Sequence, residues 1–394
     1  MESAFTAKLS RIFFSKRSLI YLSGFLFAFH IAIPTYIYSS FLGGIVSASA
    51  VGSIYAVASL LTIIFNFSAP SFLRKIGNYR TIMLVLSIEL LSLIGMAYFN
   101  SPALIVFFFI INFTAIAIAS FNFDIFLEGI SSNESTGGIR GSYLTFANTA
   151  WVLSPLVAGY ILIENNYWSV LVLSGIFIIP VFLLIKYGFE NFKDCTHESI
   201  PILKTVGRVL SERDITKSFA LSFMLQFFYS WMVIYTPVYL FSKIGFSWSE
   251  IGIMFSIMLL PFVFIEYPLG KLADKYFGEK EIMSLGFVLI AISTGLIYFL
   301  DTPNFILWTI VLFMTRVGAS IVEIMSETYF FKITDSKDMP VISLFRAMRP
   351  LAYVIGPLLA TAALALTDLR LLFPILGIIM ILGLRFSLTI HDTK

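Results

Sequence analysis

The chain has 394 residues, of which 58% are hydrophobic and 12% are charged, and its mean hydropathy is +0.92. A water-soluble domain of this length would need far more charged surface. The formal net charge of +3 gives no indication of a nucleic-acid partner, and we expect none. Composition therefore excludes an ordinary soluble protein and indicates a chain that crosses a membrane many times.

Apolar segments of about 20 residues, the length that spans a bilayer, recur about twelve times along the chain. The predicted helices cover residues 19–42, 50–69, 81–99, 102–123, 142–163, 167–187, 217–242, 249–269, 282–300, 304–331, 341–366 and 370–390. We therefore predict an all-α integral membrane protein with twelve transmembrane helices. Its domains are a six-helix bundle over residues 1–188, a connector over 189–216 and a second six-helix bundle over 217–394.

Lysine and arginine residues gather at the N-terminus and in every second connection between the predicted helices, as at Arg74, Lys217, Lys275 and Lys332. Connections on the cytoplasmic side of a membrane carry this excess of basic residues. We predict a multi-pass protein of the plasma (inner) membrane with both termini in the cytoplasm. Within the connector, residues 200–210 could form an amphipathic helix at the membrane surface, and a solvated linker helix fits equally well.

Several features recur after about 200 residues and in the same order, which indicates an internal repeat of six helices. The matching features are Gly52 with Gly252, Asn66 with Glu266, residues 70–77 with 270–278, Asp124 and Glu128 with Glu323 and Glu327, and residues 150–155 with 352–357. Two such repeats can enclose a site that opens to each side of the membrane in turn.

The sequence Gly-Lys-Leu-Ala-Asp-Lys at residues 270–275, followed by Gly278, resembles the loop motif of the major facilitator superfamily. The equivalent loop at residues 70–77 is degenerate, because Arg74 stands where the motif has aspartate. Residues 154–159 and the pair Gly356 and Pro357 are similar to the proline motif that this family carries on helix 5, especially in antiporters. The resemblance covers nearly the whole chain and implies two pseudo-symmetric bundles, a cavity lined by helices 1, 4, 7 and 10, and secondary transport.

Charged residues near the predicted cytoplasmic helix ends suggest a gate. Acidic pairs with a spacing of four share one helix face and recur in both halves, and arginines begin the following helices. We expect two ion-pair latches that hold the cytoplasmic side shut, although these charges could also only anchor and orient the helix ends. The candidate gate residues are Asp124, Glu128, Arg140, Glu266, Gly270, Asp274, Lys275, Glu323, Glu327, Arg346 and Arg349.

Three ionisable residues lie near the middle of predicted helices, where a charge is costly and asks for a partner or a role. His30 could carry a proton, although a packed, hydrogen-bonded histidine is the more common case. Glu89 suggests function, but the third helix of each half is usually peripheral in the resembled family. Arg316 could bind an anionic group in the cavity or act as counter-ion to an internal carboxylate.

Polar and aromatic side chains on the presumed cavity helices complete the candidate substrate and coupling residues. They are Asn112, Asn148, Trp151, Gln226, Tyr229 and Trp231. Aromatic surfaces with a few amides suit an amphipathic or ring-bearing solute. Many aromatic side chains of this chain must instead face lipid. Pro34 and Pro237, in matching positions of the two halves, are expected to break their helices near the cavity.

The sequence contains no phosphate-binding loop and no nucleophile elbow, and three histidines with one cysteine provide no metal-binding cluster. We therefore predict no enzyme activity, no cofactor and no metal. The leading prediction is a proton-coupled secondary transporter, monomeric, with a small solute, protons and membrane lipid as its partners.

The direction of transport is open in the sequence. The helix-5 proline motif and the aromatic pocket favour efflux of amphipathic, drug-like compounds, whereas the antiporter arginine motif is absent, since residues 111–120 contain no arginine. The alternatives are a proton symporter that imports a sugar or an organic anion, and a non-transporting receptor or assembly factor on a transporter scaffold.

Overall fold

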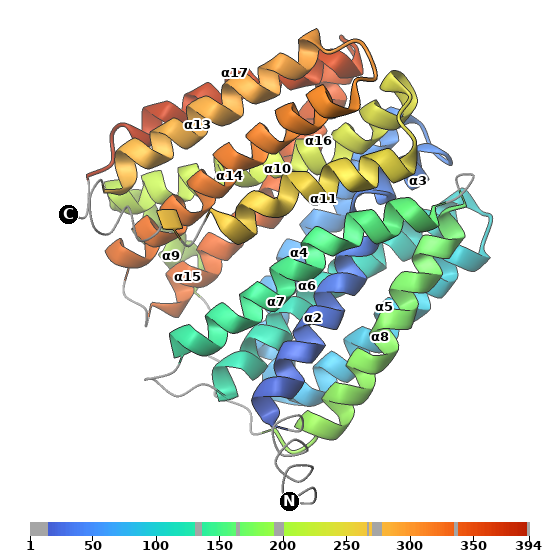
Figure 1. Ribbon diagram of the computed structural model, residues 1–394. Helices are drawn as coiled ribbons and strands as arrows, with labels where there is room; N and C mark the ends of the chain where they lie inside the picture. The colour runs from blue at the N-terminus through green and yellow to red at the C-terminus, as the bar shows by residue number, and fades with distance from the viewer. Residues whose placement is uncertain are drawn as a thin grey trace, which may run out of the picture. The chain divides into compact units, whose positions relative to one another are not determined.

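The computed structural model describes residues 15–130, 136–162, 166–192, 201–265, 268–269, 278–334 and 338–391. Throughout these ranges the regular elements are helices (Figure 1). Eleven helices in the described residues are long and apolar enough to cross a membrane. A shorter apolar helix, α11 (Trp248–Phe264), stands where the eighth span is predicted. Together they make twelve apolar helices in the described residues, and the prediction of an all-α membrane protein is confirmed.

The chain forms two compact units, one of residues 1–35 and 64–199 and the other of residues 36–63 and 200–394. The long helix α4 (Ala48–Ile76) contributes to both. The other helices of the first unit are α2 (Lys16–Thr35), α5 (Asn78–Tyr98), α6 (Pro102–Ile130), α7 (Thr136–Ile161) and α8 (Tyr167–Phe189).

The second unit holds the remaining elements. They are α3 (Tyr38–Gly43), α9 (Ile202–Ser211), α10 (Arg213–Tyr239), η1 (Leu240–Ile244), α11, α13 (Glu279–Leu296), η3 (Ile297–Phe299), α14 (Phe305–Ile333), α15 (Met339–Arg346), α16 (Met348–Leu364), η4 (Leu369–Leu371) and α17 (Leu372–Ser387). The domain boundaries at residues 188 and 216 stay a prediction.

The two units pack their helices in the same pairwise order. In the first unit, α2 packs against α7 and α8, and α5 packs against α6 and α8. In the second, α10 packs against α16 and α17, and α13 packs against α14 and α17. Each helix of one set therefore has a counterpart in the other, as the internal repeat requires.

Two glycines mark the same position of this repeat. Gly77 precedes α5 with φ 85° and ψ 156°, and Gly278 precedes α13 with φ 72° and ψ 174°. Residues with a side chain rarely adopt this backbone conformation, so glycine is required at the turn that starts each helix.

Two of the predicted spans are interrupted by proline. The first is divided into α2 and α3 just after Pro34, as expected. The span predicted over residues 341–366 is divided into α15 and α16 at Ala347. Pro350 has no N–H to donate to the carbonyl of Arg346, and its ring would clash with that carbonyl, so one continuous helix is disfavoured there. At Pro237, α10 continues for two residues before the wider turn of η1.

Candidate functional site

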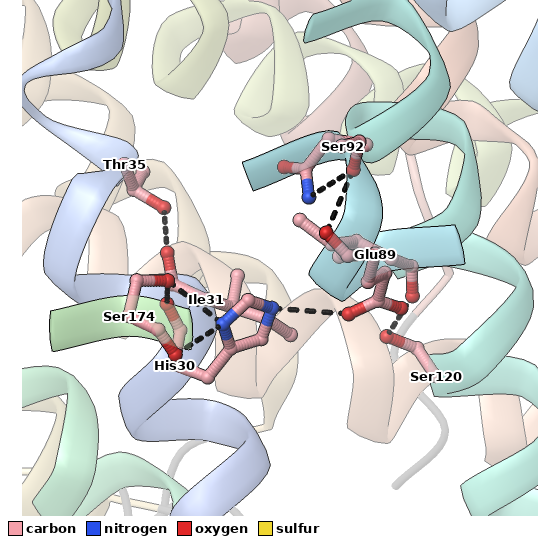
Figure 2. A network of polar contacts seen from close by, with 9 residues as sticks. His30, Ile31, Thr35, Glu89, Ser92, Ser120 and Ser174 are labelled. Carbon is pink, nitrogen blue, oxygen red and sulfur yellow. Dashed lines mark hydrogen bonds and ion pairs between the residues drawn. The ribbon is translucent and has the colours of Figure 1, made fainter. Parts of the chain in front are cut away.

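His30 and Glu89 form a buried pair in the first unit, between α2 and α5. Neither side chain is exposed, and His30 Nε2 lies 3.0 Å from Glu89 Oε2. On the other side of the imidazole ring, Nδ1 lies 2.7 Å from Ser174 Oγ and 3.0 Å from the carbonyl oxygen of Ser174, on α8. Figure 2 shows the ring held between these two partners. Three helices therefore meet at one histidine.

The hydrogen-bond partners fix where a proton lies in this pair. A carbonyl oxygen only accepts, so the short distance from the Ser174 carbonyl requires that His30 Nδ1 carries a hydrogen. The Ser174 hydroxyl donates to the carbonyl oxygen of His30 at 2.9 Å, and its oxygen is then free to accept from Nδ1. A hydrogen bond between Nε2 and Glu89 Oε2 consequently needs a further proton between these two atoms. The pair is an imidazolium with a carboxylate, or a neutral histidine with a carboxylic acid.

Removing that proton would leave one uncompensated negative charge inside the first unit. A charge in the hydrocarbon region costs at least about 2.5–3.5 kcal/mol on insertion scales. The second carboxylate oxygen, Glu89 Oε1, is buried without a hydrogen-bond partner, so little else stabilises a free carboxylate. This arrangement can hold a single proton and release it only when its surroundings change.

Asn112 extends the polar contacts toward α6. Its side-chain amide donates to Ser92 Oγ at 3.2 Å, and the Ser92 hydroxyl donates to the carbonyl oxygen of Glu89 at 2.8 Å. Asn112 is fully buried. Sequence reasoning proposed His30, Glu89 and Asn112 separately, and the structure brings them together.

Arg316 is the centre of a second cluster, which lies in the second unit. Only 1% of this arginine is exposed, yet its Nε and Nη1 atoms have no hydrogen-bond partner. The guanidinium carbon lies 5.2 Å from the centre of the Phe228 ring and 5.5 Å from that of Tyr229, both on α10. The ring faces stabilise the cation without using its donors.

Glu323 lies two helical turns from Arg316 on α14. Its Oε2 accepts a hydrogen bond of 2.6 Å from the Tyr229 hydroxyl, and its side chain is half-buried. Arg349 on α16 and Arg316 both lie close enough to interact electrostatically with this carboxylate. We call Arg316, Glu323, Tyr229 and Arg349 the Arg316 cluster.

Two tyrosines border the Arg316 cluster. Tyr36 and Tyr353 are buried and lie within electrostatic range of both Arg316 and Arg349. Trp231 on α10, another candidate, is buried, and its Nε1 donates to the carbonyl oxygen of Gly356 at 2.7 Å. This bond ties α10 to α16 beside the cluster. Gln226 is half-buried on α10, and Asn148 and Trp151 are half-buried on α7.

The candidate gate residues are only partly described. Glu266, Gly270, Asp274 and Lys275 lie outside the described residues, as does the side chain of Arg140. Asp124 is half-buried near the end of α6, and Glu128, Glu327, Arg346 and Arg349 are exposed. The two ion-pair latches stay a prediction.

Sequence reasoning missed several ion pairs in the second unit, of which three involve Lys332 or Arg208. Lys332 pairs with the buried Glu279 at 2.6 Å. Arg208 on the connector helix α9 pairs with Glu212 at 3.1 Å and with Asp338 at 2.5 Å. Both contacts raise the pKa of the Arg208 guanidinium above its usual value, and the hydrogen bond to Glu212 is the larger cause. The spacing of four from Arg208 to Glu212 was a usable signal for the first contact, but nothing in the sequence pointed to Asp338.

Residues 218–393 match the family model Major Facilitator Superfamily. The chain matches no curated protein. Its fold is similar to that of the nucleoside transporter NupG, solved as a mutant, with 12% identity, a TM-score of 0.74 and coverage of 95% of this chain and 99% of that chain. A D-xylose–proton symporter is similar with 15% identity, a TM-score of 0.75 and coverage of 96% and 98%.

Both likenesses extend over nearly the entire chain, but at these identities they establish the fold and leave the solute open. The family match covers the second half, and the packing of the helices repeats in the first half. The second half of the chain therefore matches the Major Facilitator Superfamily model, and the chain as a whole has a fold similar to that of two solved transporters.

Proposed function

We propose that this protein is a proton-coupled symporter that imports a small polar solute by alternating access. The observation that carries the proposal is the hydrogen bond between His30 Nε2 and Glu89 Oε2, which requires a proton at a site with no exposed surface. A symporter needs such a site, because the proton must be held while the protein changes its opening from one side to the other.

The chemistry of the pair suits reversible proton binding. Occupied by a proton, the pair has no net charge, and without it the pair carries one negative charge. The two groups share the proton, so its loss changes the charge of the pair as a whole. The energetic cost of the empty state favours proton capture from the side with the higher proton concentration and release when hydration of the pair increases.

Symport is favoured over efflux of drug-like compounds. The two solved structures named above are a nucleoside transporter and a D-xylose–proton symporter, which handle small polar solutes. The sequence of α6 also lacks the arginine motif of antiporters, since residues 111–120 contain no arginine. The aromatic side chains that suggested efflux have gained no support, because Trp231 and Tyr229 both use their polar atoms within the second unit.

We further propose the plasma (inner) membrane as the location, both termini in the cytoplasm and a monomeric transporter. The distribution of lysine and arginine residues among the connections supports this orientation. It places the ends of α6 and α14 that carry Asp124, Glu128, Glu323 and Glu327 toward the cytoplasm, where they would contribute to the gate.

The test is proton movement in proteoliposomes that contain a trapped pH-sensitive dye. D-Xylose, uridine and L-lactate are added outside in turn, and the transported solute should acidify the lumen. Glu89→Gln and His30→Gln should abolish this acidification. Exchange of labelled for unlabelled solute needs no net proton movement, so it should persist in both variants.

Glu279→Gln is the matched control. It also replaces a buried carboxylate, but one paired with Lys332, and it should retain acidification per solute transported. Unchanged acidification in Glu89→Gln would remove the pair from the coupling mechanism. Alkalinisation of the lumen on solute entry would indicate antiport, and absence of flux for a wider solute panel, with a co-purifying protein, would favour the receptor or assembly-factor alternative.

A further inference from the structure

The unused donors of Arg316 are the feature that the proton pair does not explain. Arg316 is the only arginine among the described residues with buried, unpartnered guanidinium nitrogens, and both Nε and Nη1 are in that state. A buried donor without a partner costs about 1–3 kcal/mol, and more when the group is charged. Ionisable residues inside transmembrane helices pair with one another or with backbone carbonyls, or mark the path of a substrate or ion.

Glu323 does not supply these acceptors. It lies on the same helix as Arg316, but its Oε2 is engaged by the Tyr229 hydroxyl at 2.6 Å. Within the described residues, no ion pair joins Arg316 to this or any other carboxylate. Glu323 is therefore an electrostatic neighbour of Arg316 that leaves the Nε and Nη1 donors without an acceptor.

The charges of the Arg316 cluster are unbalanced. Arg316 and Arg349 contribute two positive charges, and Glu323 contributes one negative charge. The tyrosines around them are neutral at physiological pH. A ligand with a single negative charge would bring the cluster to neutrality, whereas a neutral sugar would leave the excess charge in place.

The geometry of the guanidinium also favours a carboxylate. Two nitrogens of an arginine form an edge that binds both oxygens of a carboxylate side by side. A guanidinium has two such edges, Nε with Nη2 and Nη1 with Nη2, and on Arg316 each of them contains a donor without a partner, Nε or Nη1. Phe228 and Tyr229 cover the guanidinium from the α10 side. The rings leave an apolar surface next to the charged one.

We infer that Arg316 binds the carboxylate of a small organic monoanion, which is the solute that the protein transports. The inference rests on the proposed transport function and names the class of its solute. Arg316 contacts the solute directly, and Glu323, held by Tyr229, limits the site to one negative charge by repelling a second.

The experiment measures binding to the purified full-length protein in lipid nanodiscs. The probes are L-lactate and benzoate, each compared with its uncharged amide, lactamide or benzamide, and with inorganic phosphate. The acids should raise the thermal unfolding midpoint and the amides should not, because a ligand stabilises only the state that binds it. Arg316→Gln should weaken acid binding by about 30-fold or more, as loss of one partner of a buried charged contact does.

Two further variants keep the test independent of folding defects. Glu323→Gln removes the repelling carboxylate and should tighten acid binding. A variant with a folding defect would bind acids more weakly. Arg370→Gln is the matched control, since Arg370 also stacks on a tyrosine, with its guanidinium carbon 4.5 Å from the Tyr298 ring, but is paired with Asp301. It should bind acids as the unmodified protein does.

Equal stabilisation by acids and amides, or acid binding retained in Arg316→Gln, would overturn the inference. Preference for phosphate would overturn the monoanion assignment. Acid binding without any proton movement in proteoliposomes would instead contradict the proposed symport and leave the anion site standing. Proton-coupled uptake of neutral solutes only would contradict the anion site and leave the proposed symport standing.

Discussion

Lys332, in the last turn of α14, forms an ion pair of 2.6 Å with Glu279, in the first turn of α13. The carboxylate is buried, with 1% of its side chain exposed, whereas 37% of the lysine is exposed. The two partners therefore differ in what their loss costs.

We expect Lys332→Ala to lower the free energy of unfolding by about 1–3 kcal/mol, because the buried Glu279 carboxylate then loses the cation that pairs with it. Glu279→Gln should cost less, since the lysine that remains can reach water. The double variant should be more stable than Lys332→Ala alone. Thermal unfolding in detergent checks the order, and strictly additive losses would show that the pair is not coupled.

Gly77 and Gly278 should both resist replacement. Alanine at either position would have to adopt a backbone conformation essentially restricted to glycine, at a cost of about 1–3 kcal/mol. Gly207→Ala, in open space on α9, is the control and should be neutral or slightly stabilising. The measurement is the unfolding midpoint of the three variants, and a neutral effect at only one of the two turns would show that the repeat has diverged there.

Phe345 on α15 stacks on the buried Phe330 of α14, with ring centres 3.8 Å apart and an interplanar angle of 6°. Val209 of the connector helix α9 belongs to the same apolar core. We expect Phe345→Ala to cost about 3–5 kcal/mol and to loosen α9. Limited proteolysis should then cut faster within residues 201–213, while Phe331→Ala, which removes an exposed ring of the same helix region, should leave the cutting rate unchanged.

Glu323 and Arg349 lie within electrostatic range of one another. If they contribute to the gate, Glu323→Arg and Arg349→Glu should each reduce solute uptake, and the doubly exchanged variant should recover part of it. Uptake is measured in the same proteoliposomes as proton movement. A double variant no better than either single one would argue against pairing in any state of the transport cycle.

The sequence was sufficient for the number and order of the helices, because a long apolar run has one stable form in a membrane. It was less informative on where they end. The fourth span, predicted to stop at residue 123, runs on to Ile130 in α6, since Asp124 and Glu128 can remain helical beyond the hydrocarbon region. Hydropathy detects the membrane boundary rather than the end of the helix.

The pairing of His30 with Glu89 could not be obtained from the sequence. The two residues are 59 positions apart, and their contact depends on how α2 and α5 are rotated about their axes. Both helices are apolar on most sides, so the periodicity that fixes rotation in a soluble helix is weak. Ser174, whose backbone and hydroxyl orient the imidazole, had no distinguishing signal at all.

The turns at Gly77 and Gly278 are 201 positions apart, and this offset shows how the two halves have specialised. Glu89 then corresponds to the buried Ile290. Arg316 corresponds to Ala117 at the offset of 199 that matches Glu323 with Asp124, so both counterparts are apolar. The same helical arrangement thus carries an acid, Glu89, in the first half and a base, Arg316, in the second. A chimera built from two first halves or two second halves would keep the scaffold and lose half of its chemistry.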